Sequence, residues 1–407
     1  MEEAVIVSTA RTAIGRAHKG SLAEMRPDDL AAVAIDAALR KVPELPSFEI
    51  EDLMLGCAAP GGEQGFNMAR VVAILLGMDG LPGTTVTRYC ASSLQTIRMA
   101  AHAVRAGEGH AFVAAGVETV SRFVKGNSDR IPDTKNPRFA EAMERTESAA
   151  RGTASNGWTD PRTFDALPDV YIAMGQTAEN VAGLEKVSRE EQDAYAVLSQ
   201  QRYETAAARG FWQDEIVPIA LPGGGTLDHD ESPRPGTTAE KLMALETVFR
   251  PNGTVTAGNS CPLNDGAAAV VVMSERRATE LGIRPIARIV SSAVSAVSPE
   301  IMGLGPVEAT SKALDLAGMR VTDIDLVELN EAFAAQVIPS SRRIGVDLDR
   351  LNPFGGAIAL GHPFGMTGAR IMTTLLHGLE ETDSTLGLET MCIGGGQGMA
   401  MIVERMD

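Results

Sequence analysis

The sequence predicts a layered α/β protein made of two pseudo-symmetric halves with a loop domain inserted between them. Three observations support this fold class. Roughly the first 125 and the last 120 of the 407 residues follow one series of helices and strands, as an internal repeat does. In both copies, helices alternate with apolar strands, a pattern typical of mixed or parallel sheets covered by helices. The residues between the copies are rich in glycine, proline and charge, which indicates loops.

The first copy contains the elements that the repeat is built on. An amphipathic helix is expected over residues 28–39, followed by a strand over 50–57 that ends in a loop. A second helix over 92–106 opens at Cys90, and a buried strand over 110–116 closes the copy.

The second copy repeats this order. Its helices and strands are expected over residues 308–317, 324–331, about 365–379, 389–394 and, after a glycine turn, 397–404. Cys90 and His362 therefore occupy equivalent elements, each at the opening of the long helix of its copy.

The middle of the chain is expected to be an inserted loop domain that covers a site. Residues 125–169 and 221–238 indicate loops, whereas 177–182 and 189–209 have helical patterns. Long insertions of this kind often cover a functional site. The predicted boundaries are 1–122 for the first half, completed by about 264–284, then 123–263 for the insertion and 285–407 for the second half.

Composition limits the class of protein. With 407 residues, of which 44% are hydrophobic, a folded globular protein of two or three domains is expected. The net charge of -17 argues against binding to nucleic acid or acidic membranes, and no apolar run approaches membrane-spanning length. The first residues are acidic, so no signal or transit peptide is expected. The four cysteines lack CxxC spacing, which argues against a zinc site or disulfides and favours a reducing cytoplasm.

Cys90 is the first candidate for chemistry. It stands at the start of a helix beside small residues, where free backbone N–H groups and the peptide dipoles favour a thiolate over a thiol. The alternative is an inert cysteine, because free cysteines are among the most buried residue types. We favour a nucleophile that attacks carbonyl groups.

Three further segments offer partners for Cys90. His362 lies in a glycine-rich segment open to a substrate and is predicted to be the base that takes the cysteine proton, although a helix-capping histidine is the alternative. Cys392 ends a strand and precedes glycines whose backbone N–H groups suit an oxyanion better than a dinucleotide, unless it is only a core cysteine. Asn330 lies at the end of the strand expected over 324–331, where a helix N-cap is the alternative.

Taken together, these segments resemble the thiolase family, the coenzyme A-dependent enzymes that make or cleave 3-ketoacyl thioesters. The resemblance extends over essentially the whole chain. The segments that carry it are residues 7–15, the segment around Cys90, and residues 116–121, 253–259, 330–334, 355–362 and 392–398.

The resemblance implies a layered αβαβα fold and a two-step exchange of an acyl group. Cys90 would be acylated, His362 would activate it, and Cys392 would move the proton at the α-carbon or on the leaving group. Asn330, through a water molecule, and His362 would stabilise the enolate oxygen, while the backbone N–H groups of Cys90 and Gly394 would serve the acyl intermediate. Coenzyme A would be a co-substrate, with no permanently bound cofactor and no metal.

The resemblance also suggests residues that contact the substrate. Ala257 and Cys261 fall near the pantetheine, where a cysteine stands in place of the common serine and offers a weaker hydrogen bond. Met174 matches a methionine of acetoacetyl-specific members, but Ala173 replaces their histidine, which implies a wider acyl pocket. Phe364 follows the His362-Pro363 pair where an aliphatic residue is commoner. Met302, for which a buried gap-filler is the alternative, and Phe333 complete the predicted coenzyme A contacts.

Several alternatives are considered beside a 3-ketoacyl-CoA thiolase of fatty acid β-oxidation. One is an acetoacetyl-CoA-specific biosynthetic thiolase, and another is an inactive, thiolase-like lipid-binding subunit. Decarboxylating condensing enzymes share the fold but use a histidine where Asn330 stands, and a serine hydrolase is disfavoured because no GxSxG motif is present. A homodimer or homotetramer is expected from the resemblance. The natural acyl group and the direction of the reaction in the cell stay open.

Overall fold

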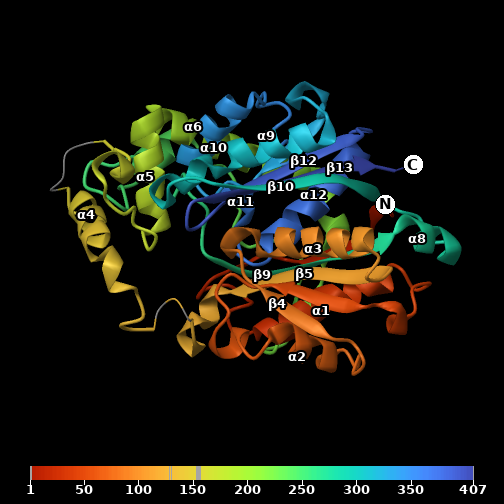
Figure 1. Cartoon of the computed structure of the whole chain (residues 1–407). Coiled ribbons are helices and arrows are strands. Elements are labelled where there is room, and N and C mark those ends of the chain that lie inside the picture. The colour runs from red at the N-terminus through yellow and green to blue at the C-terminus, as the bar shows by residue number, and fades with distance from the viewer. Residues whose placement is uncertain (1, 128, 130, 153–156, 407) are drawn as a thin grey trace.

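The computed structural model describes residues 2–127, 129, 131–152 and 157–406 (Figure 1). One large mixed sheet runs through the molecule in the order β11-β12-β13-β10-β1-β9-β5-β3-β4. The strands of the first half are β1 (Ala4–Thr12), β3 (Asp52–Gly56), β4 (Gly83–Val86), β5 (Ala111–Thr119) and β9 (Asn264–Ser274). Those of the second half are β10 (Ala287–Ala296), β11 (Leu326–Leu329), β12 (Leu386–Ile393) and β13 (Gln397–Arg405).

The two halves of the sheet have the same connectivity. In the first half, β9 pairs antiparallel with β1 and β5, and β5 pairs parallel with β3. In the second half, β13 pairs antiparallel with β10 and β12, and β12 pairs parallel with β11. The halves are joined where β1 and β10 pair antiparallel. The structure thus confirms the repeat that the sequence predicts.

Helices cover both faces of each half. The principal ones are α1 (Pro27–Arg40), α2 (Met68–Leu75), α3 (Ser92–Ala106), α9 (Gly305–Ala317), α10 (Ala334–Ile344) and α12 (Thr367–Glu381). Figure 1 shows α1 and α2 on one outer face, α9 and α10 on the other, and α3 and α12 between the two half-sheets, where they pack on each other. The result is the αβαβα arrangement that the family resemblance implies.

The central helix α12 is buried on nearly every side, although it carries the charged side chain of Arg370. Most of α12 is buried, and it packs against α3 and against strands of both halves. At the turn before α12, a Cβ atom added to Gly365 would lie 2.3 Å from the carbonyl oxygen of Val117, so only glycine permits this approach. The start of α12 is thereby pressed against the end of β5.

The inserted segment contains more regular structure than predicted. It holds α5 (Met174–Glu185) and α6 (Arg189–Ala208), close to the predicted helices. However, the stretch 125–169, expected to be loop, also contains α4 (Ala140–Ala150), because that segment is rich in the strong helix formers alanine, glutamate and methionine. A two-residue strand, β8 (Thr226–Leu227), likewise lies in the predicted 221–238 loop. Among the described residues, no helix has the length and apolar character needed to cross a membrane.

Candidate active site

Cys90 lies in a tight turn between strand β4 and helix α3. The turn is a short 3-10 helix, η3 (Tyr89–Ala91), that packs against β12 and α12 of the second half. Tyr89 has a φ of 43°, in the left-handed region that non-glycine residues adopt only at a cost. A strained residue directly before a cysteine is typical of a turn that holds a reactive side chain in place.

The protonation state of Cys90 differs from the sequence prediction. The backbone N–H groups of Gly394 and of Cys90 itself approach the sulfur and favour a thiolate, as the helix start would. Burial of the sulfur outweighs them and raises the pKa of Cys90 to about 11. Cys90 is therefore a neutral thiol at pH 7, and a nucleophilic role for it would require a base.

The backbone of His362 is held by a side chain from the first half of the protein. Its N–H donates to Oδ1 of Asn264 at 3.0 Å, and Asn264 in turn donates to the carbonyl of Gly15 at 2.9 Å. Gly361, with a φ of 112°, passes so close that an added Cβ would lie 2.4 Å from Oδ1 of Asn264. The glycine before His362 is thus required by the contact that positions the histidine.

The hydrogen bonds of the imidazole define its tautomer. Nδ1 of His362 lies 2.5 Å from the hydroxyl of Thr367, and that hydroxyl donates its single hydrogen to the carbonyl of Pro363 at 2.8 Å. Nδ1 must therefore carry a proton, and Nε2 keeps a lone pair. Nδ2 of Asn330 lies 3.3 Å from Nε2 and is oriented to donate to it. Nε2 is the atom of this ring that can accept a proton.

Burial keeps the imidazole neutral. His362 is 1% exposed, and burial, with a smaller effect from the nearby Arg370 guanidinium, lowers its pKa to about 3. The ring meets Phe364 edge-on, with centroids 5.0 Å apart. A neutral histidine with a free lone pair on Nε2 can accept a proton from a neutral thiol during attack rather than before it.

Cys392 lies at the end of β12, fully buried. Burial raises the pKa of its thiol well above the usual value, and the charges of Cys90 and Cys261 add to this effect. The pKa of Cys261 is also raised, chiefly by burial and to a smaller extent by the charge of Cys90. The three thiols from three distant segments therefore lie within electrostatic range of one another.

A cavity of about 580 Å³ opens on this site. Its wall includes Cys90, Gly394, Met174, Ala173 and Phe364. The remaining wall residues come from the loops after β3 and β5, from the turn around Tyr89, from the segment before α5 and from the turn after β12. Two of the predicted substrate positions, Met174 and Ala173, thus lie with Cys90 at one surface.

The other four predicted coenzyme A contacts lie outside the wall of this cavity. Met302 and Phe333 are buried in an apolar cluster with Cys392, against which Met174 packs. The backbone N–H of Cys261 donates to the carbonyl of Ala332 at 3.1 Å, beside this cluster. Ala257 is exposed. Among the described residues, the wall of the 580 Å³ cavity contains none of Ala257, Cys261, Met302 and Phe333.

Three residues that hold the site were not predicted as site residues from the sequence. Thr367 and Asn264 position His362, as described above. Glu118, fully buried on β5, accepts hydrogen bonds from the N–H groups of Ala58 and Gly365 at 2.8 and 2.9 Å. Burial raises the pKa of Glu118. An acidic residue within the apolar strand pattern was the sequence signal, since such a side chain needs buried partners.

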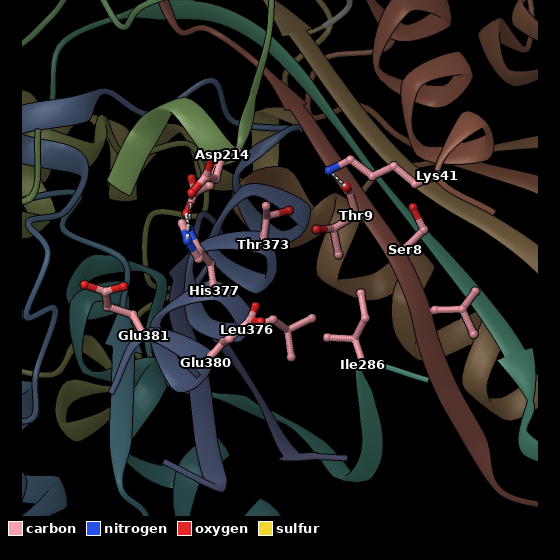
Figure 2. Close-up of a pocket in the computed structure, with 12 residues that line it drawn as sticks. Ser8, Thr9, Lys41, Asp214, Ile286, Thr373, Leu376, His377, Glu380 and Glu381 are labelled. Carbon is pink, nitrogen blue, oxygen red and sulfur yellow. Dashed lines mark hydrogen bonds and ion pairs between the residues drawn. The ribbon is translucent and has the colours of Figure 1, made fainter. Parts of the chain in front are cut away.

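A larger cavity, of about 680 Å³, lies elsewhere and shares no residue with this site (Figure 2). It is lined by Lys41, Asp214, Glu215 and His377 among others. Figure 2 shows His377 directed toward Asp214, and its ring nitrogens lie 3.9 and 3.6 Å from carboxylate oxygens of Asp214 and Glu215. Among the described residues, no group of three potential metal-binding side chains is arranged to hold an ion.

A thiol approached by two backbone N–H groups, a neutral buried imidazole and a second buried thiol are the groups that an acyltransferase working through a cysteine needs. The family models for the thiolase N-terminal and C-terminal domains match residues 4–276 and 283–405. The chain belongs to the thiolase family.

Named relatives resemble the whole chain. It is 44% identical over 415 residues to the 3-oxoadipyl-CoA/3-oxo-5,6-dehydrosuberyl-CoA thiolase of Escherichia coli K12, covering 100% of both chains. It is 43% identical over 418 residues to the 3-ketoacyl-CoA thiolase of Bacillus subtilis, covering 99% of this chain and 100% of the relative. Crystal structures of the Bacillus anthracis acetyl-CoA acetyltransferase and human mitochondrial 3-ketoacyl-CoA thiolase superpose with TM-scores of 0.86 and 0.85, each at 35% identity over 100% of this chain and 99% of the other.

Proposed function

We propose that this thiolase cleaves 3-ketoacyl-CoA substrates whose acyl group is larger than acetyl, through an acyl intermediate on Cys90. The observation that carries the proposal is the cavity of about 580 Å³ whose wall holds Cys90, Gly394 and Ala173. The Ala173 side chain ends at Cβ, so it leaves room beside the nucleophile for a longer chain.

The first half-reaction uses the neutral thiol and imidazole together. Sγ of Cys90 attacks the 3-keto carbon while its proton passes to Nε2 of His362. The N–H groups of Cys90 and Gly394 stabilise the oxyanion. The bond between C2 and C3 then breaks, which leaves an acyl thioester on Cys90 and the enolate of acetyl-CoA. Asn330 and His362 face the enolate oxygen, and Cys392 gives its proton to C2.

The second half-reaction returns the residues to their starting states. The thiol of free coenzyme A gives its proton to the Cys392 thiolate and attacks the acyl carbon. The bond from that carbon to Cys90 breaks, the Cys90 thiolate takes back the proton held by His362, and the shortened acyl-CoA leaves. In the reverse direction the same groups condense two acyl units.

An apolar group of side chains next to this chemistry offers a contact surface for the pantetheine arm. Met302, Phe333 and Met174 form an apolar group with Cys392, and Cys261 lies within electrostatic range of Cys90. We assign the pantetheine arm of coenzyme A to this apolar group and the acyl chain to the 580 Å³ cavity. The exposed Ala257 would lie at the outer edge of the coenzyme A site. No resident cofactor is needed by this scheme.

The second candidate is an acetoacetyl-specific enzyme. Met174 at the cavity wall and the similarity to a solved acetyl-CoA acetyltransferase favour it. The names of the curated relatives, which include 3-ketoacyl-CoA and β-ketoadipyl-CoA thiolases, favour larger substrates.

The deciding experiment is the thiolysis rate with 3-ketoacyl-CoAs from four to sixteen acyl carbons, with Cys90→Ala as the blank. Higher kcat/KM for chains beyond acetoacetyl supports the proposal, and preference for acetoacetyl-CoA supports the second candidate. Coenzyme A-dependent cleavage that survives Cys90→Ala would rule out both. Cys392→Ala should still become acylated on Cys90, seen as a mass increase, while α-proton exchange and condensation are lost.

We also infer that the enzyme is a homodimer or homotetramer of the cytoplasm that acts in fatty acid β-oxidation. Light scattering on the purified protein tests the first part, and a single-chain mass would contradict it.

A further inference from the structure

The cavity beside Cys90 combines an aromatic wall with a polar one. Four of its wall residues are aromatic: Tyr89, Phe123, Tyr171 and Phe364. Four others are polar and come from one segment after η4 (Val120–Lys125): Asn127, Asp129, Thr134 and Lys135. A simple hydrocarbon acyl chain would satisfy the aromatic wall and leave the polar one without a role.

Lys135 is the cation among the described residues of this polar wall. Its Nζ lies 5.5 Å from the centroid of the Tyr171 ring, a distance suited to a cation–π contact. Within the described ranges, no carboxylate lies at ion-pair distance from this ammonium group. Lys135 is exposed, so its charge is free to meet a ligand.

Tyr171 is held firmly enough to act as the platform for Lys135. Its hydroxyl accepts a hydrogen bond from the N–H of Asn136 at 3.1 Å, and its own N–H donates to Oδ1 of Asp169 at 2.9 Å. Phe139 meets the ring edge-on at 5.5 Å between centroids. The ring under Lys135 is therefore tied to two separate parts of the inserted segment.

Among the described residues of the cavity wall, Asp129 supplies the one carboxylate, and this carboxylate is already engaged. It accepts a hydrogen bond from the phenol of Tyr89, the residue next to Cys90. The charges of Asp129 and Lys135 thus belong to different contacts along the wall. Because the whole chain has a net charge of -17, an anionic group could enter this cavity only with a local cation to hold it.

We propose that Lys135 binds a carboxylate at the far end of the acyl chain, so that the enzyme acts on 3-ketoacyl-CoAs derived from dicarboxylic acids. Lys135 is then a specificity-determining residue, with the Tyr171 ring under its ammonium group and Thr134 beside it in the wall. This inference rests on the proposed function, since it requires that the acyl chain occupy the cavity next to Cys90.

The test compares pairs of substrates that differ only at the far end. Thiolysis is measured with 3-ketoacyl-CoAs of six to twelve acyl carbons that end in either a carboxylate or a methyl group. Wild type should prefer the carboxylate at its best chain length. Lys135→Met should lower kcat/KM for that substrate by roughly tenfold, the loss expected for one charged contact partly open to solvent, and leave the methyl-ended partner nearly unchanged. Lys135→Arg should keep most of the preference.

Lys312→Met is the matched control, because Lys312 is an exposed lysine on α9. Lys312→Met should leave kcat/KM unchanged for both the carboxylate-ended and the methyl-ended substrates. The phosphates of coenzyme A are another anionic source: if Lys135→Met raises KM for free coenzyme A and lowers both series equally, Lys135 binds the phosphates and the inference is wrong. A wild-type preference for methyl-ended chains at every length also overturns it, while the proposed function stands as long as those chains are cleaved. Loss of all cleavage by wild type would instead remove the proposed function itself.

Discussion

The hydroxyl of Thr367 selects the reactive tautomer of His362, so replacing it should slow catalysis without touching any group that meets the substrate. Thr367→Val keeps the shape of the side chain and removes the oxygen that accepts from Nδ1–H at 2.5 Å. The imidazole can then place its proton on Nε2, where it can no longer act as the base toward Cys90. The variant tests how the tautomer is controlled.

The size of the effect follows from burial. Thr367 is 0% and His362 1% exposed, so an Nδ1–H without a partner costs about 1–3 kcal/mol. The free energy of unfolding should fall by a similar amount. Because about 1.4 kcal/mol corresponds to a factor of ten, a loss of this size in the preference for the reactive tautomer lowers the rate of Cys90 acylation by roughly tenfold to hundredfold.

The acylation rate is best followed by single-turnover mass spectrometry of Cys90, with the tautomer read from ¹⁵N NMR of the imidazole. Thr367→Ser is the control, since it restores the hydroxyl and should restore most of the rate. A wild-type spectrum with the proton on Nε2 would refute the reasoning, and so would a Thr367→Val enzyme with wild-type acylation.

Three further predictions concern ionisation and burial. The rate of Cys90 alkylation by iodoacetamide should rise with pH toward about 11, the pKa set by burial, and a plateau near pH 8 would contradict this. Burial alone would lower the pKa of His377, but the Glu215 carboxylate, 3.6 Å from Nδ1, and the charge of Asp214 outweigh it and raise the pKa above 6.5. The folded state thus binds the His377 proton more tightly than the unfolded state does. The stability gained from this proton is fully present below pH 6.5 and is lost as the pH rises through the folded-state pKa. His377→Gln should therefore remove this pH dependence from the free energy of unfolding measured in urea. Arg11→Met should lower the free energy of unfolding by about 3–5 kcal/mol, because it removes the buried guanidinium that pairs with the buried carboxylates of Glu215 at 2.7 Å and Asp230 at 2.9 Å. Calorimetry that shows no loss would contradict the reasoning.

Local patterns were sufficient to predict most of the elements. The helix expected over 92–106 is observed at Ser92–Ala106, and the strand expected over 397–404 at Gln397–Arg405. Hydrophobic periodicity and turn residues carry such information because each element must bury one face wherever it packs. The missed helix α4 (Ala140–Ala150) shows the limit, since flanking glycine and proline suggested loop while the segment itself has high helix propensity.

The sequence by itself determined the family, the order of the elements and the candidates Cys90, His362, Asn330 and Cys392, because motifs and periodicity are properties of neighbouring residues. Only the tertiary structure decided the protonation of Cys90. The helix start predicts a thiolate, but burial raises the pKa of the thiol to about 11. Segments remote in the chain bury the sulfur of Cys90, supply the N–H of Gly394 and set the dimensions of the cavity. No local pattern records how closely such segments approach one another.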